Sequence, residues 1–331
     1  MSDMSTQVAW AGKRIAVIPC LALGDVTLFL RLAWLFHQAG AQVRFYANTL
    51  RATEAYFPWL EILPSDRLDL LQLAGEHDLV VSYVNWLSTS GASESGIADP
   101  QAVLAQPNIA FVSAKKIPAH LGLDGRVVTV DGVSLPAATR GFCLKSKRGW
   151  SMAQWLDDYA QCAYGLHSEQ PVAICLPAAQ GVKAKRVAIF PTTPQPSKNY
   201  ALKGFAWLAR RLLKQQWQVD IIAMPHEQAQ LQAQLADLPV RSFANVAELI
   251  DYLCGCEAVI SNDSGGGHLG SLLGLQTFTL TRKDRHFVWR PGFNARNTVV
   301  SPLFTFKWLG EYVWRPFVPV WRVARALGEA R

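Results

Sequence analysis

The feature that most constrains this chain is an alternation of short apolar runs with helix-like stretches, and it occurs twice. In the first half the strand-like runs lie at 15–18, 42–46, 78–83, 108–112 and 126–130. In the second half they lie at 186–190, 219–223, 258–260 and 277–280. Short apolar runs that alternate with helices predict a parallel sheet covered by helices. We therefore expect an α/β fold with two Rossmann-like halves of similar size.

The 331 residues are enough for two domains, each with its own core. A stretch rich in Pro, Ala, Gln and Lys separates the two halves and is typical of a linker. We place an N-terminal domain at 1–170, the linker at 171–185, a C-terminal domain at 186–310 and a basic, aromatic segment at 311–331. A helix in this last segment could pack back on the N-terminal domain.

Composition narrows the class of protein and of partner. Hydrophobic residues make up 50% of the chain and charged residues 17%, which is typical of a globular protein rather than a disordered one. The net charge of +7 suits an acidic partner, which could be a nucleic acid, an anionic membrane surface or a phosphorylated substrate.

The cysteines and the hydropathy of the chain indicate in which cellular compartment the protein is expected. The 6 cysteines lack the spacing of a zinc site and are expected to be buried free thiols, as in a reducing cytosol. Residues 1–12 lack the apolar core of a signal peptide, and no apolar run reaches the ~18 residues of a membrane span. We expect a cytoplasmic protein that could lie on a membrane surface.

The most specific local pattern is Ser-Asn-Asp-Ser-Gly-Gly-Gly-His-Leu-Gly at 261–270. It follows an apolar run and precedes a small-residue helical pattern, which predicts a strand, a glycine-rich turn and a helix. Glycines let backbone N–H groups approach an anion, and a helix N-terminus adds positive partial charge. Asp263 and His268 could address hydroxyls beside that anion. A phosphate next to a polyol is what a nucleotide sugar presents.

Asp25 lies in a tight turn after the first predicted strand, just before a predicted helix at 27–38. It could be a general base that takes a proton from an attacking hydroxyl. It could equally be the N-cap of the helix, since Asp is a favoured cap residue.

Polar residues follow two further strands. Thr192, Thr193 and Lys198 come after the strand at 186–190, and hydroxyls with one ammonium at a strand end could hold a diphosphate. Their alternative is an ordinary polar loop. Glu227 follows the strand at 219–223 and suits a ribose diol, or it could be a first-turn glutamate that complements the helix dipole.

The histidines do not form a metal-binding pattern. His226, His268 and His286 lack ligand spacing, so no metal and no other cofactor is predicted. His268 alone could also be a capping or core histidine.

Residues 281–331 hold ten Lys and Arg against three acidic residues, interleaved with aromatic residues. This mixture suits a membrane interface, an anionic acceptor or single-stranded nucleic acid. It also suits a packed C-terminal helix whose aromatic side chains are core. No recognised nucleic-acid motif accompanies the charge, so we expect no nucleic-acid partner.

Together these residues resemble glycosyltransferase family 9, the lipopolysaccharide heptosyltransferases. Leu-Gly-Asp-Val at 23–26 is similar to the family's glycine–aspartate turn, and 191–198 to its phosphate loop with lysine. Met-Pro-His-Glu at 224–227 is similar to its Gly-x-Pro-x-Glu turn, and 263–268 to its Asp-Thr/Ser-Gly-x-x-His signature. The chain departs from the family at Asn199 and Tyr200, where Trp-Pro is usual, and at Gly266, where proline is usual.

The resemblance implies a GT-B fold with an N-terminal acceptor domain and a C-terminal donor domain. It implies an inverting, metal-independent glycosyltransferase that moves heptose from ADP-L-glycero-D-manno-heptose to an anionic lipopolysaccharide core acceptor, at the cytoplasmic face of the inner membrane. Asp25 would be the catalytic base, Asp263 would hold the donor sugar and Glu227 the ribose. The donor diphosphate would be bound by Thr192, Thr193, Lys198, Ser264, Gly265, Gly266, Gly267 and His268.

Two alternatives stay open at this point. The same fold could use another nucleotide sugar, or a protein or capsule acceptor. The chain could also be a catalytically silent protein that binds a nucleotide sugar.

Overall fold

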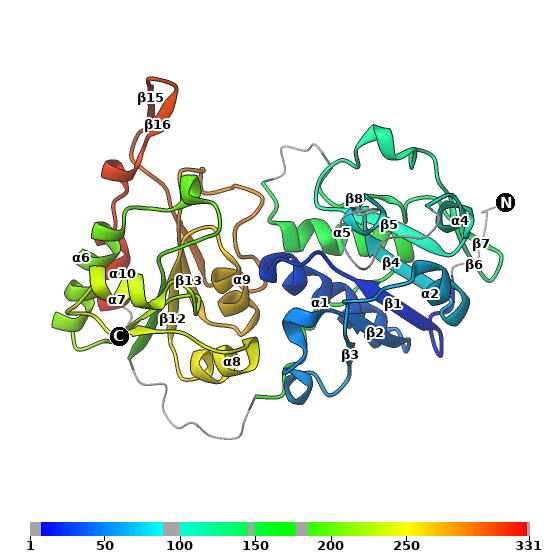
Figure 1. Ribbon diagram of the computed structural model, residues 1–331, viewed down its shortest axis with the longest axis horizontal. Helices are drawn as coiled ribbons and strands as arrows, with labels where there is room; N and C mark the ends of the chain where they lie inside the picture. Colours follow the sequence, from blue (N-terminus) through cyan, green and yellow to red (C-terminus); the bar gives the residue numbers. More distant parts are fainter. Residues whose placement is uncertain (1–7, 89–99, 145–148, 177–184, 330–331) are drawn as a thin grey trace. The chain divides into compact units, whose positions relative to one another are not determined.

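The computed structural model describes residues 8–88, 100–144, 149–176 and 185–329, and the chain divides into two compact units (Figure 1). The first unit comprises Met1–Arg148 with Met152–Cys175, and the second Gly149–Ser151 with Leu176–Arg331. Of the linker predicted at 171–185, residues 177–184 lie outside the described residues.

The first unit is a parallel sheet with helices. Its main elements are β1 (Arg14–Ile18), α1 (Leu23–Gln38), β2 (Gln42–Tyr46), β3 (Glu61–Leu63), α2 (Leu70–Glu76), β4 (Leu79–Tyr83), α3 (Asn85–Ser88), α4 (Pro100–Ala105), β5 (Ile109–Ser113), β6 (Val128–Val130), β7 (Val133–Leu135), β8 (Arg140–Gly141) and α5 (Met152–Tyr164). Within the described residues the sheet has six strands in the order β3-β2-β1-β4-β5-β8.

The second unit repeats this plan. Its main elements are β9 (Arg186–Phe190), α6 (Leu202–Lys214), β10 (Gln218–Ile222), α7 (Gln228–Gln234), β11 (Val240–Arg241), α8 (Val246–Cys254), β12 (Ala258–Ser261), α9 (Gly265–Leu272), β13 (Gln276–Leu280), β14 (Asn297–Val300), β15 (Phe306–Trp308), β16 (Glu311–Val313) and α10 (Trp321–Glu329). Its six-stranded sheet, counted over the same described residues, has the order β11-β10-β9-β12-β13-β14.

Numbered within each unit, both sheets have the strand order 3-2-1-4-5-6 of a Rossmann fold, with every neighbouring pair parallel. The predicted α/β fold with two Rossmann-like halves is confirmed. The cores explain the apolar runs in the sequence, because residues such as Ile15, Val17, Val187 and Ile189 are fully buried between sheet and helices.

One predicted strand is placed wrongly. Residues 126–130 do not join the large sheet, because Val128–Val130 pairs antiparallel with Val133–Leu135. Asp131 and Gly132 join them with φ of 50° and 77°, the backbone that a two-residue hairpin turn requires. The sixth strand of the sheet is β8, which is too short to be recognised from its sequence.

The C-terminal helix α10 packs on α6 of its own unit. Its Val323, Ala324 and Leu327 are buried in the core cluster that also holds Leu208 and Leu212 of α6. The apolar face of α10 is therefore buried within the second unit. Residues 330–331 of the predicted segment lie outside the described residues.

The exposure of the cysteines and the length of the helices bear on two further expectations. All 6 cysteines are free, but only Cys256 is buried, while Cys162 and Cys175 are exposed. The prediction of uniformly buried thiols is wrong, since these two side chains do not face a core. Among the described residues no helix has the length and apolarity that crossing a membrane requires.

Candidate functional site

The strands β9 and β12 are neighbours in the second sheet, with Phe190 paired to Ser261 at their carboxyl ends. In this strand order they form the switch point, where the connections leave in opposite directions and ligands bind in such sheets. The loop with Lys198 follows β9, and the segment with Asp263 follows β12. Two sequence-predicted segments 65 positions apart are thereby brought together.

Lys198 and Asp263 contact each other directly. The Lys198 ammonium lies 3.2 Å from the Asp263 carboxylate, and their side chains are 44% and 14% exposed. The Asp263 carboxylate is thus mostly buried, while the Lys198 ammonium stays accessible to a ligand. A cation beside a carboxylate at a helix start can bind a phosphate and a hydroxyl together.

Asn262 fixes the loop that carries Lys198, a role the sequence did not suggest. Its side chain is fully buried, donates from Nδ2 to the Pro191 carbonyl at 2.7 Å and accepts at Oδ1 from the Tyr200 N–H at 2.8 Å. Asn262 therefore ties both ends of the Lys198 loop to β12. The hint of this role in the sequence is the position of Asn262 directly before Asp263.

Arg315 holds the same loop from the C-terminal segment. Its guanidinium donates to the Asn199 carbonyl at 2.7 Å and to the Pro196 carbonyl at 3.2 Å, on the two sides of Lys198. Nothing local in the sequence pointed to this contact, because 116 positions separate Arg315 from Asn199.

The two predicted threonines differ in what they contact. The Thr192 hydroxyl donates to Glu227 Oε2 at 2.9 Å, and the Met224 N–H donates to the same oxygen at 3.3 Å. The Thr193 hydroxyl stays within its own loop, 2.7 Å from Asn199 Oδ1. Thr192 therefore orients Glu227, whereas Thr193 orders the loop before Lys198.

Glu227 is the N-cap residue of α7 and makes no side-chain cap hydrogen bond. The helix begins one residue later, so Glu227 lies at the N-terminus of α7, where a carboxylate can also complement the helix dipole. Its carboxylate faces Thr192, across from the end of the neighbouring strand β9.

The glycines at 265–267 lie inside helix α9 rather than in a turn before it. A Cβ at Gly266 would lie 2.7 Å from the Phe190 ring, and one at Gly267 would lie 2.5 Å from Ser261 Oγ. The predicted glycine-rich turn is wrong, because these glycines let the first turn of α9 lie directly against β9 and β12. Their N–H groups belong to the first helical turn, where N–H groups lack partners within the helix.

Three buried polar atoms around this turn have no hydrogen-bond partner among the described residues: Ser261 Oγ, Ser264 Oγ and His268 Nδ1. Ser264 is the N-cap of α9 and makes no cap hydrogen bond. Burial lowers the pKa of His268, although the Asp263 charge acts in the opposite direction. The imidazole is therefore neutral near pH 7, and the turn offers hydroxyls and amides without partners.

In the first unit, Asp25 lies in the first turn of α1, which begins at Leu23 rather than at Thr27. The N-cap is Ala22, whose carbonyl accepts from the Asp25 N–H at 2.9 Å. The alternative that Asp25 is the N-cap is therefore wrong, since that position requires a non-helical backbone.

Asp25 has titratable neighbours at the switch point of the first sheet, where β1 and β4 are paired. Burial raises the pKa of the Cys20 thiol, and the charge of Asp25 and a hydrogen bond with its side chain raise it further. Burial and the same charge raise the pKa of Tyr83, which ends β4. Both groups are neutral near pH 7, and Asp25 is the acidic side chain beside them.

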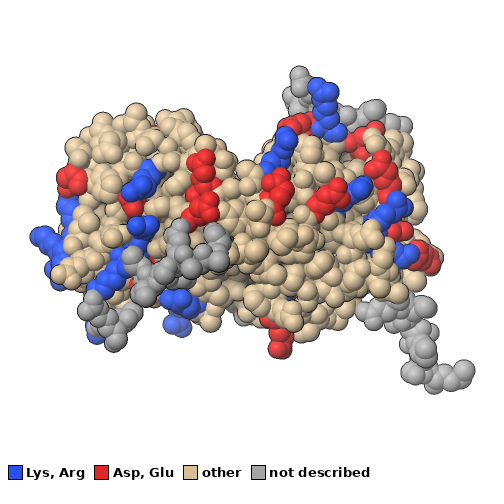
Figure 2. Space-filling view, turned by 90° about the horizontal axis from the view of Figure 1, so that it is seen from below, with Lys and Arg blue, Asp and Glu red and all other residues tan. Residues whose placement is uncertain are grey.

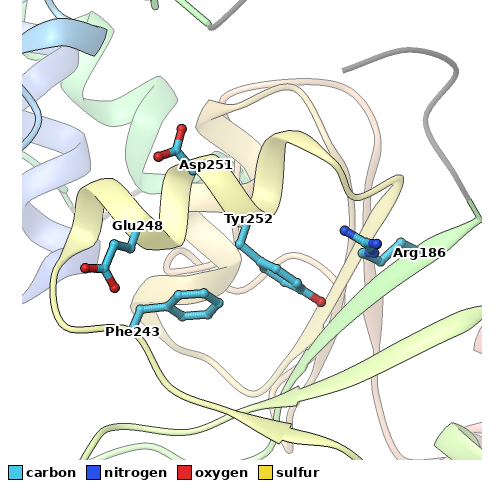
Figure 3. Close-up of a pocket in the computed structure, with 5 residues that line it drawn as sticks. All are labelled: Arg186, Phe243, Glu248, Asp251 and Tyr252. Atoms are coloured by element: carbon cyan, nitrogen blue, oxygen red, sulfur yellow. The ribbon is translucent and has the colours of Figure 1, made fainter. Parts of the chain in front are cut away.

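A separate pocket in the second unit is lined by Arg186, Phe243, Glu248, Asp251 and Tyr252 (Figure 3). Tyr252 reaches from α8 towards Arg186, the first residue of β9, so the pocket lies by the amino end of that strand. It contains none of the predicted site residues. Its Tyr252 hydroxyl donates to buried Asp220 at 2.7 Å, and burial raises the pKa of Tyr252.

The described residues offer neither one continuous patch of charge in the face shown (Figure 2) nor a metal site. On the face that Figure 2 shows, Lys and Arg lie among Asp, Glu and wide uncharged areas rather than in one continuous patch. In the part of the chain that the structure describes, no group of His, Cys, Asp and Glu is arranged to hold a metal ion.

Comparison with known proteins agrees with the fold and with the family that the sequence resembles. The family model described as Glycosyltransferase family 9 (heptosyltransferase) matches residues 123–304. No curated protein sequence matches the chain significantly.

Solved structures match over nearly the whole chain. The glycosyl transferase family 9 structure from Veillonella parvula DSM 2008 is 14% identical, with 97% of this chain and 99% of that chain covered and a TM-score of 0.67. E. coli heptosyltransferase WaaC with ADP-2-deoxy-2-fluoro heptose is 12% identical, covered at 96% and 100%, with a TM-score of 0.61. E. coli ADP-heptose lps heptosyltransferase II is 15% identical, covered at 95% and 98%, with a TM-score of 0.55. These matches confirm the GT-B-like fold.

Proposed function

Because the chain belongs to glycosyltransferase family 9 and is a transferase, we propose that it moves heptose from ADP-L-glycero-D-manno-heptose to a lipopolysaccharide core acceptor. The transfer inverts the anomeric carbon and needs no metal. The acceptor is anionic and lipid-borne, so the protein works on the cytoplasmic face of the inner membrane through a peripheral contact.

The observation that carries this proposal is the Lys198–Asp263 pair at the start of α9, beside three buried polar atoms without partners. In the proposal Lys198 and the first-turn N–H groups of α9 bind the donor diphosphate, together with Ser264 and His268. Asp263 holds hydroxyls of the sugar. Glu227, oriented by Thr192, accepts from the ribose hydroxyls.

The chemical step requires a base and a stabilised leaving group. Asp25 takes the proton of the acceptor hydroxyl as its oxygen attacks the anomeric carbon. The bond from that carbon to the diphosphate oxygen breaks on the opposite face, and ADP leaves with the electron pair. Lys198 and the α9 amides offset the charge that grows on the diphosphate, so no metal is needed for this purpose.

A thermal-shift panel of ADP, GDP, UDP and CDP, repeated with ADP-heptose, tests the donor. A ligand that binds only the folded state raises the unfolding midpoint, so ADP and ADP-heptose should raise it most. A larger shift with another nucleotide would assign another donor. Absence of any shift with ADP would contradict the heptose proposal.

Binding and transfer assays distinguish two alternative functions. A different acceptor, such as a protein or a capsule polysaccharide, would leave ADP-heptose binding intact but give no transfer to lipopolysaccharide core. A catalytically silent nucleotide-sugar-binding protein would bind ADP-heptose and transfer to no acceptor.

A further inference from the structure

The hairpin of β15 and β16 exposes large apolar side chains in one short segment. Leu303, Phe304 and Trp308 are 63%, 55% and 65% exposed, and Leu309 at the tip is 90% exposed. Figure 1 shows the two strands projecting from the second unit, away from its parallel sheet. Large apolar side chains exposed this close together in the sequence are a feature of interaction sites.

The two faces of the hairpin differ in chemistry. The register pairs Phe306 with Val313 and Trp308 with Glu311, so these four residues share one face. Lys307 pairs with Tyr312 on the other face. The hairpin therefore carries an aromatic face with a single acid near the tip, and a face with a cation and a tyrosine.

Cations gather on the tyrosine face. The Arg282 guanidinium lies 3.7 Å from the centroid of the Tyr312 ring, and the Lys307 ammonium 5.0 Å from it. The segment with Arg282 is tied to the base of the hairpin, because the Ser301 hydroxyl donates to the Lys283 carbonyl at 2.7 Å. Trp and Tyr beside Lys and Arg are typical of side chains at the boundary between lipid and water.

Leu309 occupies a position that leucine disfavours. It forms the two-residue turn with Gly310, and their φ values are 48° and 82°. Such turns favour Asn, Asp or Gly, as at Asp131 and Gly132 in the first unit. Leu309, the most exposed apolar side chain of the turn, therefore occupies a position that favours a polar residue. Burial of this side chain in a partner would explain why leucine stands there.

The base of the hairpin is firmly attached. The Phe304 and Phe317 ring centroids are 3.8 Å apart, and Phe306 lies 6.1 Å from Phe317. The chain then continues into buried Trp314 and into Arg315, which holds the Lys198 loop. The base of the hairpin is thus anchored to the second unit.

We propose that residues 303–313 insert into the interfacial layer of a bilayer that contains anionic lipid. Leu309 and Trp308 enter the acyl boundary, while Lys307 and Arg282 contact acidic headgroups. A projecting tip suits a bilayer, whereas a folded protein partner would need a matching cavity. The proposal rests on the peripheral membrane contact proposed above and assigns it to a defined segment.

Co-sedimentation with vesicles of phosphatidylethanolamine and phosphatidylglycerol tests the proposal. Leu309→Asn should lower vesicle binding about tenfold, since a buried leucine contributes about that factor or more. Asn is favoured at this turn, so lost folding cannot explain the effect. Lys307→Gln should weaken binding to these vesicles but not to pure phosphatidylcholine vesicles.

The matched control is Trp207→Ser, which removes an exposed tryptophan of α6 from the same unit. It should leave vesicle binding unchanged. Bromine-labelled lipids should quench tryptophan fluorescence of the wild-type protein, and Trp308→Phe should remove most of that quenching while it keeps binding.

Unchanged binding of the Leu309→Asn variant would overturn the proposal. So would loss of binding in Trp207→Ser, or a lipid-free dimer that Leu309→Asn converts to a monomer, because the hairpin would then contact a second copy. The ADP thermal shift is read in the same samples. Its persistence in Leu309→Asn separates failure of membrane docking from failure of the proposed transfer.

Discussion

Lys198 Nζ lies 3.2 Å from Asp263 Oδ2, and this ion pair joins two loops at the switch point of the second sheet. In the proposed donor complex the Lys198 ammonium binds the diphosphate of the donor, and the Asp263 carboxylate binds its sugar. The two residues are therefore expected to act on different kinetic parameters.

Lys198→Ala should lower kcat by about 100-fold to 1000-fold, since the ammonium stabilises charge that grows as ADP leaves. Stability should change little, because the side chain is 44% exposed. Steady-state transfer from ADP-heptose measures the effect. Lys203→Ala, an exposed lysine at the start of α6, serves as the control and should keep wild-type kcat. A wild-type kcat in Lys198→Ala would remove this role.

Thr192 and Glu227 should act as one unit in ribose binding. Thr192→Val and Glu227→Gln should each raise the donor KM about threefold to tenfold. The double variant should resemble Glu227→Gln alone, because Thr192 acts through its 2.9 Å hydrogen bond to that carboxylate. The donor KM of the wild type, both single variants and the double variant completes a double-mutant cycle. Strictly additive effects on KM would show that the two residues act separately.

Gly266 should be needed for packing as much as for donor binding. Gly266→Ala places a Cβ 2.7 Å from the Phe190 ring and should lower stability by about 1–3 kcal/mol. Phe190→Leu in the same chain should recover part of this loss. Gly75→Ala is the matched control, since a Cβ within α2 meets nothing within 4 Å. Denaturant unfolding measures the free energy of unfolding of the three variants. A wild-type stability of Gly266→Ala would contradict the predicted role of Gly266 in packing.

The sequence was sufficient to predict two Rossmann-like halves, because buried parallel strands are continuous apolar runs. It was not sufficient to place the glycines at 265–267. The same residues suit a phosphate-binding turn and a tightly packed helix, and only the distance to Phe190 separates the two. The start of α1 was missed for a similar reason, since Ala22 is a weak cap and leaves no signal.

The site was predictable where its residues belong to local motifs and not where they act at a distance. Lys198, Asp263 and Glu227 follow strands, and the strand order brings the first two together. Arg315 could not be found, because its contact with the Asn199 carbonyl depends on the path of the C-terminal segment. Asn262 was visible in the motif, but its role appears only when both of its hydrogen-bond partners are known.

His268 should make stability depend on pH. Burial lowers its pKa below the ordinary 6.5, so the unfolded chain binds a proton at a pH where the folded protein does not. Stability should be full above about pH 6.5 and fall as the pH drops towards the folded pKa. Thermal unfolding between pH 5 and 8 should show a shallower fall for His268→Gln than for wild type. His226→Gln, an exposed histidine, should keep the wild-type slope.

The central claim is that Asp25 is the base of a glycosyl transfer, and Asp25→Asn tests it most directly. The variant keeps the shape of the side chain but cannot take up the proton, so transfer from ADP-heptose should fall by about 100-fold to 10,000-fold. The ADP-heptose thermal shift should stay at its wild-type value, because the donor residues lie on other segments. Wild-type turnover in Asp25→Asn, with the donor shift retained, would contradict the account.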